Sequence, residues 1–158
     1  MKSKMTIGFV LVFLAMLGIG LLAISPVSAV EATARLTPPF YSMEDPAPES
    51  FKITLTPPSP YTAYDVDPST ILVEGIVTML PIPDWPKVTK RSFSFKVDGT
   101  ALLNWVILPK IWHMAPAPGS KVDVTFTVTG EFYDSTPFYA TCEITVMTEH
   151  ASPPPPPP

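Results

Sequence analysis

The stretch "KVDVTFTVTGEFYDSTPFYATCEITVM", residues 121–147, decides the fold of this 158-residue chain. Apolar side chains alternate with threonine and charged residues on both sides of the segment "YDSTP". Because successive side chains of a β-strand point to opposite faces, this period of two predicts two strands that form a hairpin. We expect the buried face to contain Val122, Val124, Phe126, Val128, Phe138, Ala140, Cys142, Ile144 and Val146.

The polar residues of the same stretch predict its turn and its outer face. Asp134 is suited to accept hydrogen bonds from its own backbone, and Pro137 has no amide hydrogen to continue the ladder at that point. Threonine is β-branched and polar, so it fits an exposed pleated surface. The outer threonines are Thr125, Thr127, Thr129, Thr141 and Thr145.

Three further strands are predicted upstream. Alternation over 51–55 and over 93–97 indicates half-buried strands. The nearly continuous apolar run 71–80 indicates a central strand, with a possible bulge at Gly75. The segment "DGTALLNWVILP" (98–109) fits either a strand or a short helix that Thr100 caps, that presents Leu102, Leu103 and Val106 as its apolar face, and that Pro109 ends.

Sheets with one apolar face need a second sheet or a closed barrel to cover that face. The sequence therefore predicts an all-β chain: an immunoglobulin-like antiparallel β-sandwich of about six to seven strands, in which the segment near 100–107 is either one short helix or a further strand. We divide it into segment 1–29, an N-terminal strand and proline-rich loop (30–50), the sandwich domain (51–149) and a proline-rich tail (150–158).

Segment 1–29 has the pattern of a secretory signal. Two lysines precede an apolar run from Ile7 to Ile24, and Val27 and Ala29 fit a cleavage site before Val30. The alternative is an uncleaved anchor, although the run is at the short limit of what spans a bilayer. Either way we expect the remaining chain outside the cytoplasm, secreted or at the cell surface, with membrane contact only through this segment.

The chain closes with six prolines, Pro153–Pro158, which favour an extended polyproline II rod. This segment could be a stalk, a solvated tail or the beginning of a longer proline-rich linker.

The charge composition limits the classes of binding partner. Residues 30–158 carry 8 Lys or Arg and 14 Asp or Glu, a net charge of −6, and we expect no basic cluster. This balance argues against nucleic acid and against anionic lipid surfaces. One cysteine, Cys142, excludes an internal disulfide, and its place in the alternating pattern indicates a buried apolar role.

Two segments resemble a family of small secreted prokaryotic (archaeal and bacterial) β-sandwich modules of unknown function. The segment 64–71, "YDVDPSTI", is similar to the family's "YDVxDIDxSTI" pattern. The segment 122–147 is similar to its closing hairpin, "VTLTVTGxLxDGTPFxGxDTIxV", at Gly130, Asp134, Thr136, Pro137, Phe138 and Ile144. The resemblance spans most of 51–147 and implies a β-sandwich outside the cell, often beside other extracellular modules.

The sequence departs from this family in a loop of the kind that holds calcium. Here that loop is "LPIPDWPKVTKRS", with one aspartate, Asp84, and three cations. Calcium needs six to eight oxygen ligands, so we expect no cofactor from this loop. Asp65 and Asp67, spaced as alternate residues, could contribute to a calcium site elsewhere, and the alternative is that they stabilise turns.

The aromatic residues suggest the remaining candidate site. Trp85, Tyr61 and Tyr133 could stack on sugar rings, whereas Trp105 falls in an apolar run and is expected in the core. No catalytic motif is present in the sequence, so we expect no enzyme. The chain is expected to be a non-catalytic extracellular module that binds other cell-envelope proteins or serves a structural role. The alternative is a carbohydrate-binding module whose partner is a polysaccharide.

Overall fold

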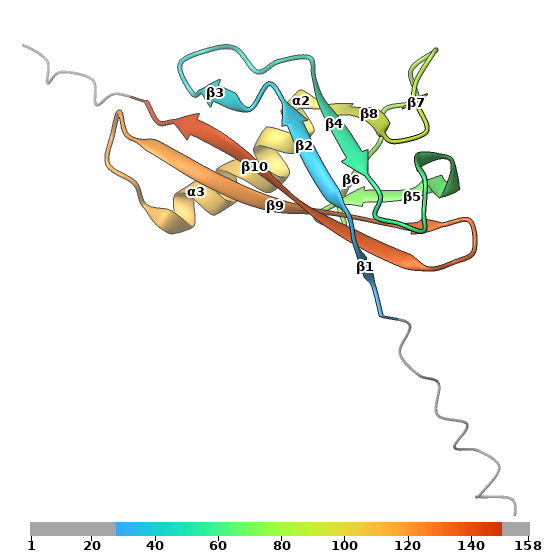
Figure 1. Cartoon of the computed structure of the whole chain (residues 1–158). Helices are drawn as coiled ribbons and strands as arrows, with labels where there is room; N and C mark the ends of the chain where they lie inside the picture. The colour runs from blue at the N-terminus through green and yellow to red at the C-terminus, as the bar shows by residue number, and fades with distance from the viewer. Residues whose placement is uncertain (1–27, 150–158) are drawn as a thin grey trace, which may run out of the picture.

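The computed structural model describes residues 28–149. Ten strands form two sheets in a sandwich-like arrangement, and one helical segment packs against them (Figure 1). The predictions for the signal segment, apart from its last two residues, and for the tail concern parts outside this range. Among the described residues, no helix is both long and apolar enough to cross a membrane.

The first sheet contains six strands in the order β1-β10-β9-β5-β6, and β3 also pairs with β10. Their bounds are β1 (Val30–Glu31), β3 (Phe40–Ser42), β5 (Val66–Val73), β6 (Val77–Thr78), β9 (Lys121–Phe132) and β10 (Pro137–Met147). The β9–β10 hairpin confirms the predicted one, with paired residues from Glu131–Pro137 to Lys121–Met147. All its predicted inward residues are buried except Val122, which is half-buried.

The second sheet contains four antiparallel strands in the order β2-β4-β8-β7. Their bounds are β2 (Thr33–Thr37), β4 (Ser50–Thr56), β7 (Lys87–Val88) and β8 (Phe93–Asp98). The strands predicted at 51–55 and 93–97 are confirmed. Their apolar residues, Phe51, Ile53, Leu55, Phe93, Phe95 and Val97, are buried and form one core with the inner faces of β5, β9 and β10.

The number and direction of the strands differ from the prediction. Four of the ten strands, β1, β3, β6 and β7, are only two or three residues long, too short for a periodic signal. β1 and β3 also run parallel to β10, whereas an antiparallel sandwich was expected. The reason is that the chain pairs with β10, crosses to the second sheet as β2, and then returns to β10.

A second crossing lies on the opposite side of the sandwich. After β6 pairs with β5, Met79 bridges Val97 in the second sheet, and the Leu80 amide donates to the Lys96 carbonyl at 2.8 Å. The chain therefore connects the two sheets along both of their sides.

The predicted central strand over 71–80 is confirmed only for residues 71–73, which end β5, and the bulge predicted at Gly75 is wrong. The run is a hairpin in which Glu74 and Gly75 both have positive φ (49° and 68°), and the Ile76 amide donates to the Val73 carbonyl at 3.0 Å. Two consecutive positive φ values are what a type I′ turn requires, and glycine adopts them readily. The register shift in β5 lies earlier, between Asp67 and Leu72.

The alternative of a helix near 100–107 is confirmed, with different limits. Helix α2 (Gly99–Leu102), the π-helical turn η2 (Leu103–Ile107) and α3 (Leu108–Met114) form one continuous segment. Asp98, not Thr100, is the cap, and its Oδ1 accepts from the Ala101 amide at 2.6 Å. Pro109 does not end the helix, because the wider π turn before it relieves the usual clash between a proline and the preceding turn.

The two ends of the described chain lie at opposite ends of the molecule (Figure 1). The chain enters at β1, beside the first residues of β10, and leaves after the last residues of β10. The exit is held in place, because the Gly119 amide donates to the Glu149 carbonyl at 2.9 Å and Thr148 Oγ1 lies 3.0 Å from the Ala117 carbonyl oxygen.

Candidate functional site

Tyr61 and Tyr133, two of the predicted ligand-binding residues, lie together beside the β9–β10 turn. The Tyr61 ring stacks on the Phe132 ring with centroids 3.8 Å apart and an interplanar angle of 2°. The Tyr61 hydroxyl oxygen lies 3.2 Å from Asp134 Oδ2 and 3.0 Å from Thr136 Oγ1. Tyr61 is therefore fixed at both its ring and its hydroxyl, and it forms a rigid wall.

These residues enclose a pocket of about 510 Å³, lined by Pro60, Tyr61, Asp65, Phe132, Tyr133 and Asp134. We call it the tyrosine pocket. Tyr133 is 67 % exposed, so its ring is available to a ligand. The turn places it there, because Ser135 adopts φ +65°, in the left-handed region, and the Ser135 amide donates to the Phe132 carbonyl at 2.8 Å.

Asp134 supplies a fixed negative charge at the mouth of the tyrosine pocket. The Thr136 backbone amide donates to Asp134 Oδ1 at 2.9 Å, and this hydrogen bond is the main cause that lowers the pKa of Asp134 below its usual value. The carboxylate therefore stays ionised and accepts hydrogen bonds. An exposed aromatic ring beside hydrogen-bond acceptors is a combination that can bind a sugar by stacking and by hydroxyl contacts.

Asp65 and Asp67, the candidate calcium ligands, are each engaged in their own turn. Asp65 Oδ2 accepts from the Thr62 amide at 2.7 Å and from its hydroxyl at 2.8 Å, at the start of the short 3-10 helix η1 (Ala63–Asp65). Asp67 Oδ1 accepts from the Ser69 amide at 2.9 Å and from its hydroxyl at 2.7 Å. Within residues 28–149, no group of three or more Asp, Glu, His or Cys side chains is placed to hold a metal.

Trp85, the third predicted ligand-binding residue, does not line the tyrosine pocket. It is half-buried in the loop between β6 and β7. The Lys87 and Lys96 ammonium nitrogens lie 5.3 and 5.1 Å from its ring centroid, within the range of cation–π attraction. Trp85 is thus a contact for two lysines, and the three predicted aromatic residues do not form a single platform.

The prediction that Trp105 fills the core is wrong. Trp105 is 66 % exposed on the helical segment, and Trp112 is 69 % exposed. The helical interpretation of this segment would have predicted that Trp105 is exposed. A helix that buries Leu102, Leu103 and Val106 places residue 105 away from its buried face. Reading the segment as a continuous apolar run concealed the 3.6-residue period.

Comparisons with known proteins do not identify a relative, because no protein-family model, curated protein sequence or solved structure matches the chain.

Proposed function

We propose that this chain is an exported, non-catalytic β-sandwich module that spaces and binds components at the cell surface. The observation that carries the proposal is the placement of the chain ends at opposite ends of the molecule, which suits a module inserted in series between two other segments (Figure 1). The signal pattern in 1–29 and the proline run in 153–158 support the same role from the sequence.

The order of the strands supports the immunoglobulin-like form of the fold. Taking β2, β4, β5, β6, β7, β8, β9 and β10 as strands A, B, C, C′, D, E, F and G gives one sheet A-B-E-D and another C′-C-F-G. β1 and β3 then correspond to segments of strand A that pair with strand G. The helical segment is the main addition, inserted between strands E and F. The resemblance of residues 51–147 to secreted prokaryotic sandwich modules fits this assignment.

The pairing at the chain ends suits a load-bearing spacer. β1 and β3 run parallel to β10, so tension between residues 28 and 149 slides these strands past each other. The bonds that resist this sliding include Ala32 N to Tyr139 O at 2.8 Å, Thr145 N to Pro39 O at 2.9 Å and Met43 N to Met147 O at 2.9 Å. Bonds loaded in this way share the force, because none can open without disturbing its neighbours.

Export is tested by producing the full chain in a bacterial host with an intact secretion pathway. We expect mass spectrometry to show that the recovered protein begins at Val30. We also expect added protease to reach and digest the chain in cells whose cell wall and any outer membrane are permeabilised while the cytoplasmic membrane stays intact. A matched variant, Leu14→Arg, places a charge in the apolar run and should keep the chain inside. Recovery of intact, protease-protected wild-type chain from the cytoplasm would overturn the proposal.

A second candidate role, carbohydrate binding, is favoured by the tyrosine pocket. It combines a rigid wall, an exposed ring on Tyr133 and the ionised Asp134 carboxylate. A neutral polysaccharide would offer both ring faces and hydroxyl donors to these groups. Affinity electrophoresis in gels that contain hydroxyethyl cellulose tests this role, since retardation by this neutral polymer should be lost in the Tyr133→Ala variant.

A further inference from the structure

The outer face of the second sheet gathers the cations of a chain that is acidic overall. Four of the eight cationic side chains among residues 28–149 come from its strands: Arg35 on β2, Lys52 on β4, Lys96 on β8 and Lys87 on β7. Two more, Lys90 and Arg91, lie in the β7–β8 turn. The only acid on these strands is Asp98, which caps α2. We call Arg35, Lys52, Lys87 and Lys96 the basic face.

The strand register brings these cations into two adjacent rows. Lys52 pairs directly with Lys96, and in the neighbouring row Arg35, Thr54, Ser94 and Lys87 follow one another across the four strands. Adjacent strands are about 4.8 Å apart. The basic face is therefore a compact array of positive charges with the Thr54 and Ser94 hydroxyls between them, joined by a 3.0 Å hydrogen bond.

Packing alone does not explain this arrangement. Like charges directly opposite each other on neighbouring strands are unfavourable, and Lys52 and Lys96 are such a pair. The Lys110–Glu74 ion pair, at 2.9 Å, involves none of the residues of the basic face. Trp85 adds a second, independent feature, because its ring lies near both the Lys87 and the Lys96 ammonium groups and restrains them close together.

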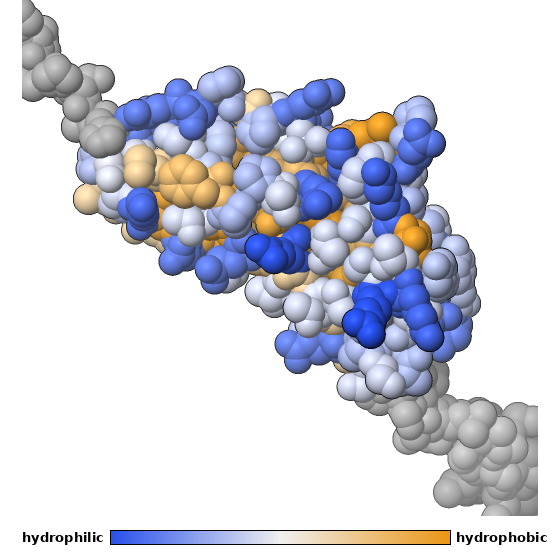
Figure 2. All heavy atoms as spheres, turned by 45° about the horizontal axis from the view of Figure 1, so that its top comes forward, coloured by the Kyte–Doolittle hydropathy of each residue, from blue (hydrophilic) through white to orange (hydrophobic). Residues whose placement is uncertain are grey.

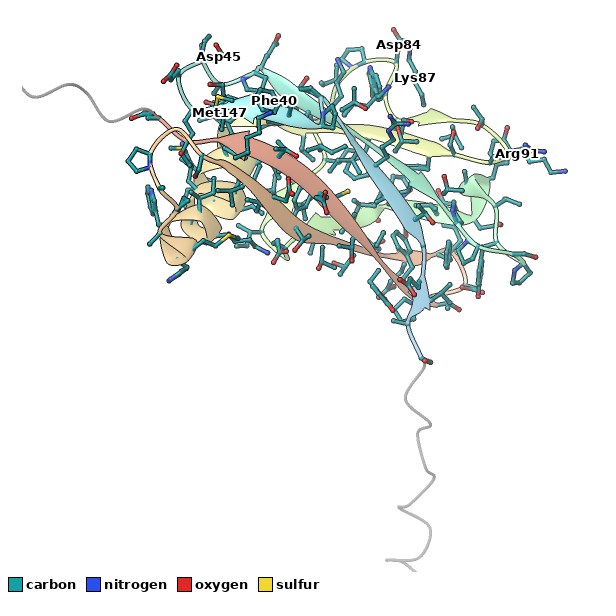
Figure 3. All side chains as sticks on the ribbon, turned by 60° about the vertical axis from the view of Figure 1, so that its left-hand side comes forward. Phe40, Asp45, Asp84, Lys87, Arg91 and Met147 are labelled. Carbon is teal, nitrogen blue, oxygen red and sulfur yellow. The ribbon has the colours of Figure 1, made fainter. Side chains whose placement is uncertain are left out.

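Figures 2 and 3 show the surroundings of the basic face. In Figure 2 the side that carries β2 and β4 comes forward, and hydrophilic residues (blue) extend across it between smaller apolar areas (orange). Figure 3 shows Lys87 near Asp84 at the loop before β7, and Arg91 pointing away from the ribbon at the turn that follows. Asp84 is the acid labelled beside Lys87 in that view.

We propose that the basic face binds an acidic polysaccharide, a polymer with carboxylate groups repeated along an extended chain. This proposal specifies a ligand class for the binding role proposed above and rests on that role. Carboxylates would contact the Lys52, Lys96, Lys87 and Arg35 side chains, and the Thr54 and Ser94 hydroxyls would contact sugar hydroxyls. Trp85 would act as a positioning residue that preorganises two lysines.

Two other occupants fit the structure less well. A second copy of the chain would have to use the outer face of the first sheet, where Asp123, Glu131 and Glu143 are separated by threonines and do not form rows that match the basic face. Nucleic acid binding to single strands uses exposed aromatic rings, and the aromatic ring at the basic face, Trp85, is half-buried and has lysines beside it.

Affinity electrophoresis of residues 30–158 in gels containing polygalacturonate tests the proposal, with hydroxyethyl cellulose as the neutral polymer. We expect retardation by polygalacturonate that falls as salt is added. The double variant Lys52→Glu/Lys96→Glu should lose at least about tenfold in affinity, given the gain of each lysine near an anionic surface. Lys121→Glu, a single Lys-to-Glu substitution on the opposite sheet, should bind nearly as wild type.

Other results of the same gels separate the alternatives. If the double variant does not fold, Lys52→Gln/Lys96→Gln and the salt dependence of the wild type give the same information. Trp85→Phe should keep most of the binding, since a smaller ring still attracts the lysines, while Trp85→Ala should lose severalfold. Absence of retardation by polygalacturonate, or equal loss in Lys121→Glu, overturns the basic face as a site. Retardation only by the neutral polymer, abolished in Tyr133→Ala, would leave the proposed binding role with the tyrosine pocket instead.

Discussion

Gly99→Ala is expected to lose about 3 kcal/mol or more of unfolding free energy. Gly99 is buried at the start of α2, and a Cβ atom built on it would lie 1.7 Å from the Pro48 carbonyl oxygen. Its amide also donates to the Glu49 carbonyl at 3.1 Å, so the two backbones cannot separate without breaking that bond. The clash is with backbone, which cannot rotate away as a side chain can. Urea unfolding monitored by circular dichroism measures the loss.

Gly75→Ala is the matched control. The same methyl group at this position meets nothing within 4 Å, and its cost arises only from the positive φ of 68°. We expect a loss of about 1–2 kcal/mol, the penalty of a left-handed conformation for a residue with a Cβ. Equal unfolding free energies for the two variants would contradict the close contact between the 43–49 loop and the first residue of the helical segment.

The second large effect is expected in the pH dependence of the unfolding free energy, and its source is the buried thiol of Cys142. Burial raises the pKa of the Cys142 thiol to about 12, from an ordinary value of 9.0, in a side chain that is 1 % exposed. The unfolded chain releases this proton above about pH 9, and the folded chain retains it until about pH 12. The stabilising difference is therefore fully present below pH 9 and is lost as the pH rises from 9 to 12, by up to about 4 kcal/mol.

A comparison with Cys142→Ala isolates this contribution. Lysines and tyrosines titrate in the same range in both proteins, so their effects cancel in the difference between the two stability curves. The difference should be constant up to pH 9 and then change by about 1.4 kcal/mol per pH unit. Parallel curves up to pH 11, or rapid reaction of native Cys142 with a thiol reagent at pH 7, would show that the thiol is not buried in the core.

The hairpin was predictable in detail because its period of two extends over two long strands. Residues 121–147 form one pair of strands, so local pattern and tertiary packing agree along the whole stretch. The error at Gly75 has a different origin. An apolar run without alternation shows that the residues are buried, but it does not show where the chain reverses. The Glu74–Gly75 pair provided a turn signal that the apolar residues on both sides obscured.

The candidate site was only partly predictable, since its residues come from distant segments. Tyr61 and Tyr133 were identified singly by residue type, and only the stacking of Tyr61 on Phe132 brings them into one pocket. The basic face was missed for the same reason. Lys52 and Lys96 are 44 positions apart in the sequence, so the absence of a basic run concealed a cluster that the strand register creates.

The central claim is that the chain begins and ends at opposite ends of the module, in strands that resist sliding past each other. Single-molecule pulling of two variants, which differ only in their attachment points, tests this claim. Both proteins carry Cys142→Ala, one with attachment points at residues 28 and 149 and the other at residues 28 and 135. In the first, tension slides β1 and β3 along β10. In the second, both points lie at the β1 end of the sandwich, so tension separates the bonds one after another. We predict a markedly higher unfolding force for the first pair of attachment points. Equal forces in the two directions, or a higher force through residues 28 and 135, would contradict the proposed arrangement of the chain ends.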